Sequence, residues 1–153
     1  AMNDRGTARS RYGSILTYAG CPIMWKSKLA QEISLSTTEA EYTGLSYALR
    51  DTIPVMELLK EMKEVGIIDK YKTPKVHCKV FEDNSGAVEI AKFPKARPRT
   101  KHLNNKLHHF RSYVGDGEIS IHYISSEKQP ADYLSKPLSQ QPHETHRNTT
   151  QGW

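Results

Sequence analysis

The chain of 153 residues contains little of several features that mark common protein classes. Its two cysteines, Cys21 and Cys78, lie far apart and form no CxxC or CxxH pattern, which excludes a cysteine-ligated zinc site. Two isolated thiols are also typical of a reducing compartment. No apolar run approaches the roughly 20 residues of a membrane-spanning helix, and no signal-peptide pattern opens the chain. We therefore expect neither a membrane span nor a secretion signal.

Apolar residues are also few, because they make up 37% of the chain and the mean hydropathy is −0.67. A chain of this length still buries about 68–70% of the surface that it exposes when unfolded. One hydrophobic core is therefore feasible, and the length predicts a single domain.

Acidic residues are absent from the segment 92–111, which holds seven cations. Because the whole chain has a net charge of +5, the rest of it carries −2. A basic segment on a mildly acidic body favours a polyanionic partner, although a solvated helix face or loop would look the same. The seven cations are Lys92, Lys95, Arg97, Arg99, Lys101, Lys106 and Arg111.

The apolar pattern predicts elements in the order β-β-α-β-α-α-β-α, which indicates an α/β or α+β domain. Ser36 with Glu39 forms a capping box at the start of the longest helix, and Pro54 should kink that helix or split it. Gly66 should end it. The predicted elements are a hairpin at 12–27, this helix, a strand at 76–81, helices from 85 and near 103–114, a strand at 119–123 and a short helix from 131.

Three acids, Glu41, Asp83 and Asp132, stand near a strand end or helix starts. Carboxylates in such places can converge at one edge of an α/β sheet, where they repel one another unless a divalent cation joins them. Oxygen ligands suit Mg²⁺ or Mn²⁺, and a pair of such ions can catalyse phosphodiester hydrolysis. The alternative is structural: Asp83 and Asp132 as helix caps and Glu41 as an ordinary first-turn acid.

Four segments make the chemistry more specific. In chain order they are STTEAEY at 36–42, EDNSGA at 82–87, RTKHL at 99–103 and QPADYLSKPL at 129–138. Together they resemble the ribonuclease H domain of copia-type LTR retrotransposon polyproteins. The run AGCPIMWKSK at 19–28 resembles the strand-turn-strand that precedes the first of these segments in that family. The resemblance covers about residues 9–138.

The resemblance implies a ribonuclease H-like mixed sheet flanked by helices over residues 1–138, followed by a polar C-terminal tail at 139–153. The family carries its first catalytic Asp on a central strand before the hairpin. No such strand precedes the hairpin here, and Asp4 falls where the following loop should be. We therefore expect an N-terminally truncated domain that lacks the first strand and its Asp.

The resemblance also implies that Glu41, Asp83 and Asp132 are catalytic and hold two Mg²⁺ ions, with Mn²⁺ as a possible substitute. Glu41 matches the helix Glu of the superfamily. Glu39 lies two residues away, about 200° around a helix, so the two acids cannot face one site.

The implied substrate is an RNA–DNA hybrid, which proteins recognise through phosphates and 2′-hydroxyls. The implied partner is the reverse transcriptase domain of the same polyprotein, in an intracellular, cytoplasmic virus-like particle, with no membrane and no small-molecule cofactor. Candidate substrate-binding residues are Thr37, Thr38, Asn84, Ser85, Arg97, Arg99, Lys101 and His102.

The first hypothesis is thus metal-dependent endonucleolytic hydrolysis of the RNA strand of hybrids during reverse transcription. A catalytically dead nucleic-acid-binding remnant or tether domain is the alternative. A transposase or integrase would share the fold and the acids, but the segments STTEAEY and ADYLSKPL favour the ribonuclease H family.

Overall fold

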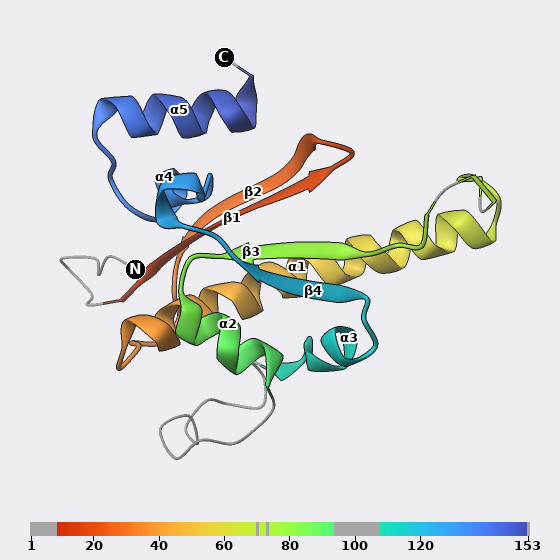
Figure 1. The fold of residues 1–153 in the computed structure, drawn as a ribbon, viewed down its shortest axis with the longest axis horizontal. Coiled ribbons are helices and arrows are strands. Elements are labelled where there is room, and N and C mark those ends of the chain that lie inside the picture. Colours follow the sequence, from red (N-terminus) through yellow and green to blue (C-terminus); the bar gives the residue numbers. More distant parts are fainter. Residues whose placement is uncertain (1–8, 70, 73, 94–107, 153) are drawn as a thin grey trace.

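The computed structural model describes residues 9–69, 71–72, 74–93 and 108–152 (Figure 1). It is a mixed α/β structure whose elements follow the predicted order, with one additional helix at the C-terminal end. None of the described helices combines the length and apolar character of a membrane span. The elements are β1 (Arg11–Tyr18), β2 (Cys21–Leu29), α1 (Thr37–Glu64), β3 (Cys78–Glu82), α2 (Ser85–Lys92), α3 (Arg111–Gly115), β4 (Ile119–Tyr123), a 3₁₀ turn (Ser126–Lys128), α4 (Asp132–Ser135) and α5 (Gln140–Gln151).

Strands β1 and β2 form the predicted hairpin. They pair antiparallel, with Ile15 opposite Trp25. Ala19 and Gly20 connect them with φ values of 51° and 81°. Positive φ at both central residues is the geometry of a type I′ turn, whose twist matches that of the flanking strands.

Helix α1 begins at the predicted capping box. The Ser36 hydroxyl accepts a hydrogen bond from the Glu39 amide at 3.1 Å, and the Glu39 carboxylate accepts one from the Leu35 amide at 2.9 Å. Pro54 was expected to kink the helix or split it, and the split does not occur, because α1 is one element from Thr37 to Glu64. Pro54 is exposed, while Leu49 and Met56 on either side of it are buried in the same core. Packing of this continuous apolar face compensates for the hydrogen bond that proline cannot donate.

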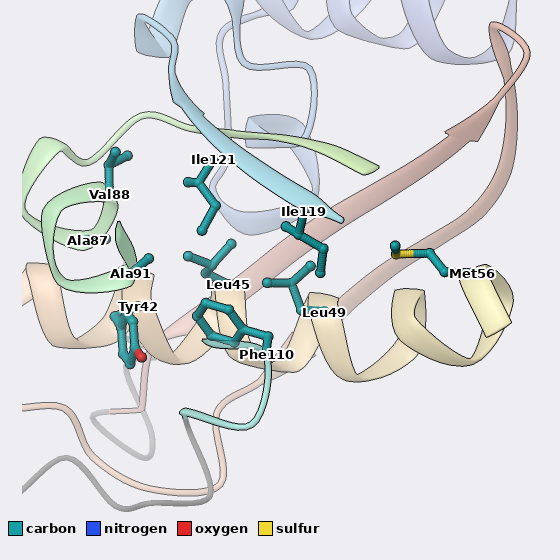
Figure 2. Packing of buried hydrophobic residues seen from close by; sticks show 10 residues of the cluster. All are labelled: Tyr42, Leu45, Leu49, Met56, Ala87, Val88, Ala91, Phe110, Ile119 and Ile121. Carbon is teal, nitrogen blue, oxygen red and sulfur yellow. The ribbon is translucent and has the colours of Figure 1, made fainter. Parts of the chain in front are cut away.

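The hydrophobic core lies between α1, α2 and the strand β4. Figure 2 shows Leu45 and Leu49 of α1 facing Ile119 and Ile121 of β4, with Phe110 beside them. Apolar residues at helical spacing on α1 therefore meet the inward positions of a strand that alternates with period two. The buried cluster consists of Tyr42, Leu45, Leu49, Met56, Ala87, Val88, Ala91, Phe110, Ile119 and Ile121.

The strands form two separate two-stranded sheets in the described part of the chain. One is the β1–β2 hairpin, and the other is the parallel pair β3–β4, in which Val80 lies opposite Ile121. The sequence predicted one mixed sheet without its first, central strand. The antiparallel and the parallel strand pairs of such a mixed sheet are both present, but no described strand connects the two pairs into one sheet.

Helix α5 lies in the segment that the sequence identified only as a polar tail. Its buried residues are His146 and Thr150, and the Thr150 hydroxyl is 3.1 Å from the hydroxyl of Tyr133 in α4. The helix thus packs through polar side chains. Apolar periodicity, the main signal for helices, had almost nothing to detect there.

Gly13 of β1 provides a test of how α4 packs on the hairpin. A Cβ atom at this position would lie 2.7 Å from the Ala131 carbonyl oxygen and 2.7 Å from Leu134 Cβ. We expect Gly13→Ala to lower the free energy of unfolding by about 1–3 kcal/mol, since overpacking against backbone forces a shift. Gly115→Ala is the matched control: nothing lies within 4 Å there, so it should be neutral or raise stability by about 0.5–1 kcal/mol. Denaturant unfolding of both variants checks this, and equal stabilities would contradict the close packing of α4 on β1.

Candidate metal centre

Three carboxylates come together where β3 ends and α1 begins. Glu41, Glu82 and Asp83 each offer an oxygen, and these oxygens lie within 4.8 Å of one another. We call these three residues the carboxylate cluster. Among the described residues this is the one group of three or more His, Cys, Asp or Glu side chains close enough to share an ion.

Local structure explains the position of each acid. Ser36 starts α1, so Glu41 lies in the second turn of a helix that crosses beneath the strands. Glu82 is the last residue of β3, and Asp83 follows it before α2 begins. The Ser126 hydroxyl in the 3₁₀ turn after β4 donates to Asp83 Oδ2 at 2.6 Å and holds that carboxylate. Two strands and two helices therefore define the cluster.

The environment of Glu82 strongly disfavours a negative charge. Its side chain is buried, with 8% of the residue exposed, and the Asn84 amide donates to Glu82 Oε1 at 3.1 Å. Burial, and after it the nearby carboxylate of Glu41, raise the pKa of Glu82 to about 8, although the amide of Asn84 opposes this shift. Asp83 adds a smaller repulsion.

The cluster fits a divalent cation. Close carboxylates with one member buried repel one another, and a hard cation cancels that repulsion while accepting oxygen ligands. Glu41, Glu82 and Asp83 are the residues that would hold such an ion. The set of donors is oxygen only, which favours Mg²⁺ or Mn²⁺ over zinc.

The structure does not bring the third predicted acid, Asp132, into this cluster. Asp132 is buried at the start of α4, and its Oδ2 lies 2.6 Å from Nζ of Lys136. Helix α4 packs on β1 through Gly13, and this contact determines where Asp132 lies. Asp83 and Asp132, the two helix caps of the structural alternative, are not N-caps, because Asn84 caps α2 and Ala131 precedes α4.

Four of the predicted substrate-binding residues surround the cluster. Thr37 and Thr38 open α1, while Asn84 caps α2 and Ser85 begins it. The two helix starts are close neighbours, since a Cβ on Gly86 would lie 2.9 Å from Thr38 Cγ2. Backbone amides at helix N-termini attract anions, so phosphate oxygens would find donors beside the carboxylates.

The remaining predicted contacts lie outside the described residues. These are Arg97, Arg99, Lys101 and His102, and the same holds for Asp4. At the two ends of the basic segment, Lys92 closes α2 and Arg111 donates to the Ile90 carbonyl oxygen at 3.2 Å. The proposed docking role of this segment stays a prediction.

Sequence comparison decides the family. The chain is 32% identical over 133 residues to the retrovirus-related Pol polyprotein from transposon TNT 1-94 of Nicotiana tabacum, and 31% identical over 136 residues to that from transposon RE1 of Arabidopsis thaliana. These alignments cover 87% and 89% of the chain. The chain is homologous to a segment of copia-type LTR retrotransposon Pol polyproteins. A yeast relative, the Transposon Ty1-NL2 Gag-Pol polyprotein of Saccharomyces cerevisiae, is 27% identical over 146 residues, or 95% of the chain.

This Pol homologue spans only a small part of its relatives. It covers 9% of the TNT 1-94 and RE1 polyproteins and 8% of the Ty1-NL2 polyprotein. No protein-family model matches the chain, and no solved structure matches it significantly.

Glu82 is the member of the cluster in this Pol homologue that sequence reasoning missed. The strand was predicted to place Val76, Cys78 and Val80 on one face, and the same alternation places Glu82 on that face two residues later. An acid at an inward position at the end of a strand was therefore a usable signal. The resemblance drew attention to Asp83 instead, because only that residue matches the family motif.

The raised pKa of Glu82 predicts how stability depends on pH. The folded chain keeps the Glu82 proton up to about pH 8, whereas the unfolded chain loses it near the ordinary value of 4.5. Between these values the folded state binds more protons, so this group lowers the free energy of unfolding as pH rises. In chelator, the free energy of unfolding should fall by a few kcal/mol, as an order of magnitude, between these two pH values.

Glu82→Gln should flatten this pH dependence, because its amide stays neutral. Glu127→Gln, at an exposed position in the 3₁₀ turn, is the matched control and should leave the dependence unchanged. Denaturant unfolding at pH 5, 6.5 and 8 with chelator measures the difference. If the stability of the wild type changed with pH no more than the stability of Glu82→Gln, the assigned burial of Glu82 would be wrong.

Proposed function

We propose that this chain is the ribonuclease H region of a retrotransposon Pol polyprotein and that it hydrolyses the RNA strand of RNA–DNA hybrids. The observation that carries the proposal is the carboxylate cluster, in which Glu41 and Asp83, two of the three acids chosen from the sequence, lie together. The Pol relationship supports a role in retrotransposition, and the four motif segments narrow that role to this reaction.

The chemistry would depend on divalent cations held by Glu41, Glu82 and Asp83, and Asp132, the third acid chosen from the sequence, stays a predicted ligand outside this cluster. Two bound Mg²⁺ ions would supply an activated water and stabilise the departing 3′-oxygen of the RNA. The carboxylates fix where the scissile phosphate can sit, and the hydroxyl of Ser126 keeps Asp83 oriented. Glu82 adds negative charge on the buried side of the cluster once it is ionised.

The substrate would be positioned by the helix starts beside the cluster. Thr37 and Thr38 offer hydroxyls and free amides of α1, and Ser85 offers the same at α2. These donors suit the phosphates and 2′-hydroxyls that distinguish an RNA strand in a hybrid. The basic segment 92–111 would add phosphate contacts that do not depend on sequence. In this proposal the reverse transcriptase region of the polyprotein delivers the hybrid.

The test is a cleavage assay with labelled RNA annealed to DNA, alongside the same RNA alone and a DNA duplex. Two chains are compared: the 153 residues, and a longer chain that carries upstream the acid-bearing strand that the family places before the hairpin. We expect cation-dependent cleavage of the hybrid only, restored or increased in the longer chain because it supplies the family's first Asp. Hybrid binding without cleavage in both chains would favour the alternative of a nucleic-acid-binding module and overturn the proposal.

A further inference from the structure

Strand β3 and the residues before it carry different chemistry on their two faces. Val76, Cys78 and Val80 alternate on the face that packs against the core. The other positions of the same alternation hold Lys75, His77, Lys79 and Phe81, all of them exposed. On β4, Ile119 and Ile121 point into the core, and Ser120 and His122 take the outward positions. We call the outward residues His77, Lys79, Phe81, Ser120 and His122 the β3–β4 platform.

The platform presents two rings side by side. Phe81 is 51% exposed, although it lies in the middle of the structure and not at a chain end. Its ring centroid lies 5.8 Å from that of His122 on the neighbouring strand, with the two planes inclined by 34°. Register explains this contact, because Phe81 and His122 lie directly opposite each other in the parallel ladder. A flat base could stack on such a pair.

Hydrogen bonds hold the platform in place. His77 Nδ1 lies 3.0 Å from the Gly117 carbonyl oxygen, which can only accept, so this nitrogen carries the proton. Ser120 Oγ lies 2.9 Å from His77 Nε2 and 3.0 Å from His122 Nε2. The serine hydroxyl thus links both imidazoles and fixes the ring that faces Phe81. A surface fixed before binding loses less conformational freedom when a ligand arrives.

The charge of the platform favours an anion. Lys79 is exposed between His77 and Phe81, Lys75 precedes them, and no outward position of β3 or β4 holds an acid. Among the described residues, α1, α2 and α3 pack against these two strands from the core side, while α4 contacts the hairpin (Figure 1). The outward face is therefore open in the described part of the chain.

We propose that the β3–β4 platform binds single-stranded nucleic acid, with bases stacked on Phe81 and His122 and the backbone on Lys79. Aromatic rings interleaved with cations on a sheet face are the chemistry of single-strand recognition. A duplex would gain little, since its bases are already stacked on one another. Phe81 lies directly before Glu82 and Asp83, so the platform leads toward the carboxylate cluster but uses none of its residues.

The test measures binding of fluorescein-labelled single strands of about eight nucleotides to the full chain, in chelator so that no cation occupies the cluster. Oligouridine and oligothymidine arms separate RNA from DNA, and a hybrid duplex is the competitor. Wild type should bind single strands more tightly than the duplex. Phe81→Ala should weaken binding at least about fivefold, and Phe81→Trp should keep affinity with its fluorescence quenched by the bound bases.

Residues outside the platform provide matched controls. Tyr71→Ala removes a ring that is 88% exposed in the turn before β3, and Lys72→Ala removes a lysine whose side chain is 87% exposed. Both should bind like wild type, whereas Lys79→Ala should lower the salt slope of log K by about 0.7. Thermal midpoints confirm that each variant folds. Absence of single-strand binding, unchanged affinity in Phe81→Ala, or an equal loss in Tyr71→Ala would each overturn the proposal. The outcome is independent of hybrid cleavage, because chelator abolishes that reaction.

Discussion

Asp83→Asn should abolish cation-dependent cleavage of hybrid RNA. The test uses whichever is active, the 153-residue chain or the longer chain with the upstream strand. The amide has the shape of the carboxylate and can still accept the hydrogen bond from Ser126, but it carries no charge to hold a cation. Removing a residue that only hydrogen-bonds to a metal ligand lowers activity about 10–100-fold. Removing the ligand itself should therefore lower the cleavage rate at least about a hundredfold. Initial rates on a labelled hybrid measure the effect.

Two further variants make this result specific. Ser126→Ala removes the hydrogen bond to Asp83 but leaves its charge, and should lower the rate by no more than about 10–100-fold. Asp116→Asn alters an exposed acid in the turn before β4 and should have no effect. Hybrid affinity in chelator should be unchanged by Asp83→Asn. Cleavage by Asp83→Asn at a near wild-type rate would remove Asp83 from the metal centre.

Much of the fold could be predicted from local sequence signals. The hairpin at 12–27, the capping box at Ser36 and the alternation in 119–123 each depend on residues within a few positions of one another, and each prediction is confirmed. The continuous course of α1 through Pro54 could not be predicted this way. It depends on residues far along the chain, such as Ile119, that pack against the helix.

The residues of the candidate site also differ in how far local sequence could predict them. Motif positions were sufficient to choose Glu41 and Asp83, because the strand end and the helix cap that place them are local features. Glu82 and Asp132 required the three-dimensional arrangement. The alternation of β3 places Glu82 on the inward face, but its approach to Glu41 depends on how α1 packs below the strand, and the position of Asp132 depends on how α4 packs on the hairpin. Ion pairing with Lys136 could have been anticipated from the i, i+4 spacing.

Glu39 and Glu41 form a matched pair within one helix, and they should respond in opposite ways to the same substitution. Glu39 accepts a hydrogen bond from the Leu35 amide at the start of α1, whereas Glu41 belongs to the carboxylate cluster. Glu39→Gln should therefore lower the free energy of unfolding by about 0.5–1 kcal/mol and leave hybrid cleavage nearly intact.

Glu41→Gln should do the reverse. It removes a negative charge beside buried Glu82, so in chelator the folded chain should be as stable as wild type or more stable near pH 8. The same change removes a ligand, so the rise in thermal midpoint that Mg²⁺ or Mn²⁺ gives the wild type should shrink and cleavage should be lost. Melting with and without cation, together with hybrid cleavage rates, separates the two roles. Activity lost in Glu39→Gln but kept in Glu41→Gln would reverse the assignment, since a helix places only one of these two acids toward the end of β3.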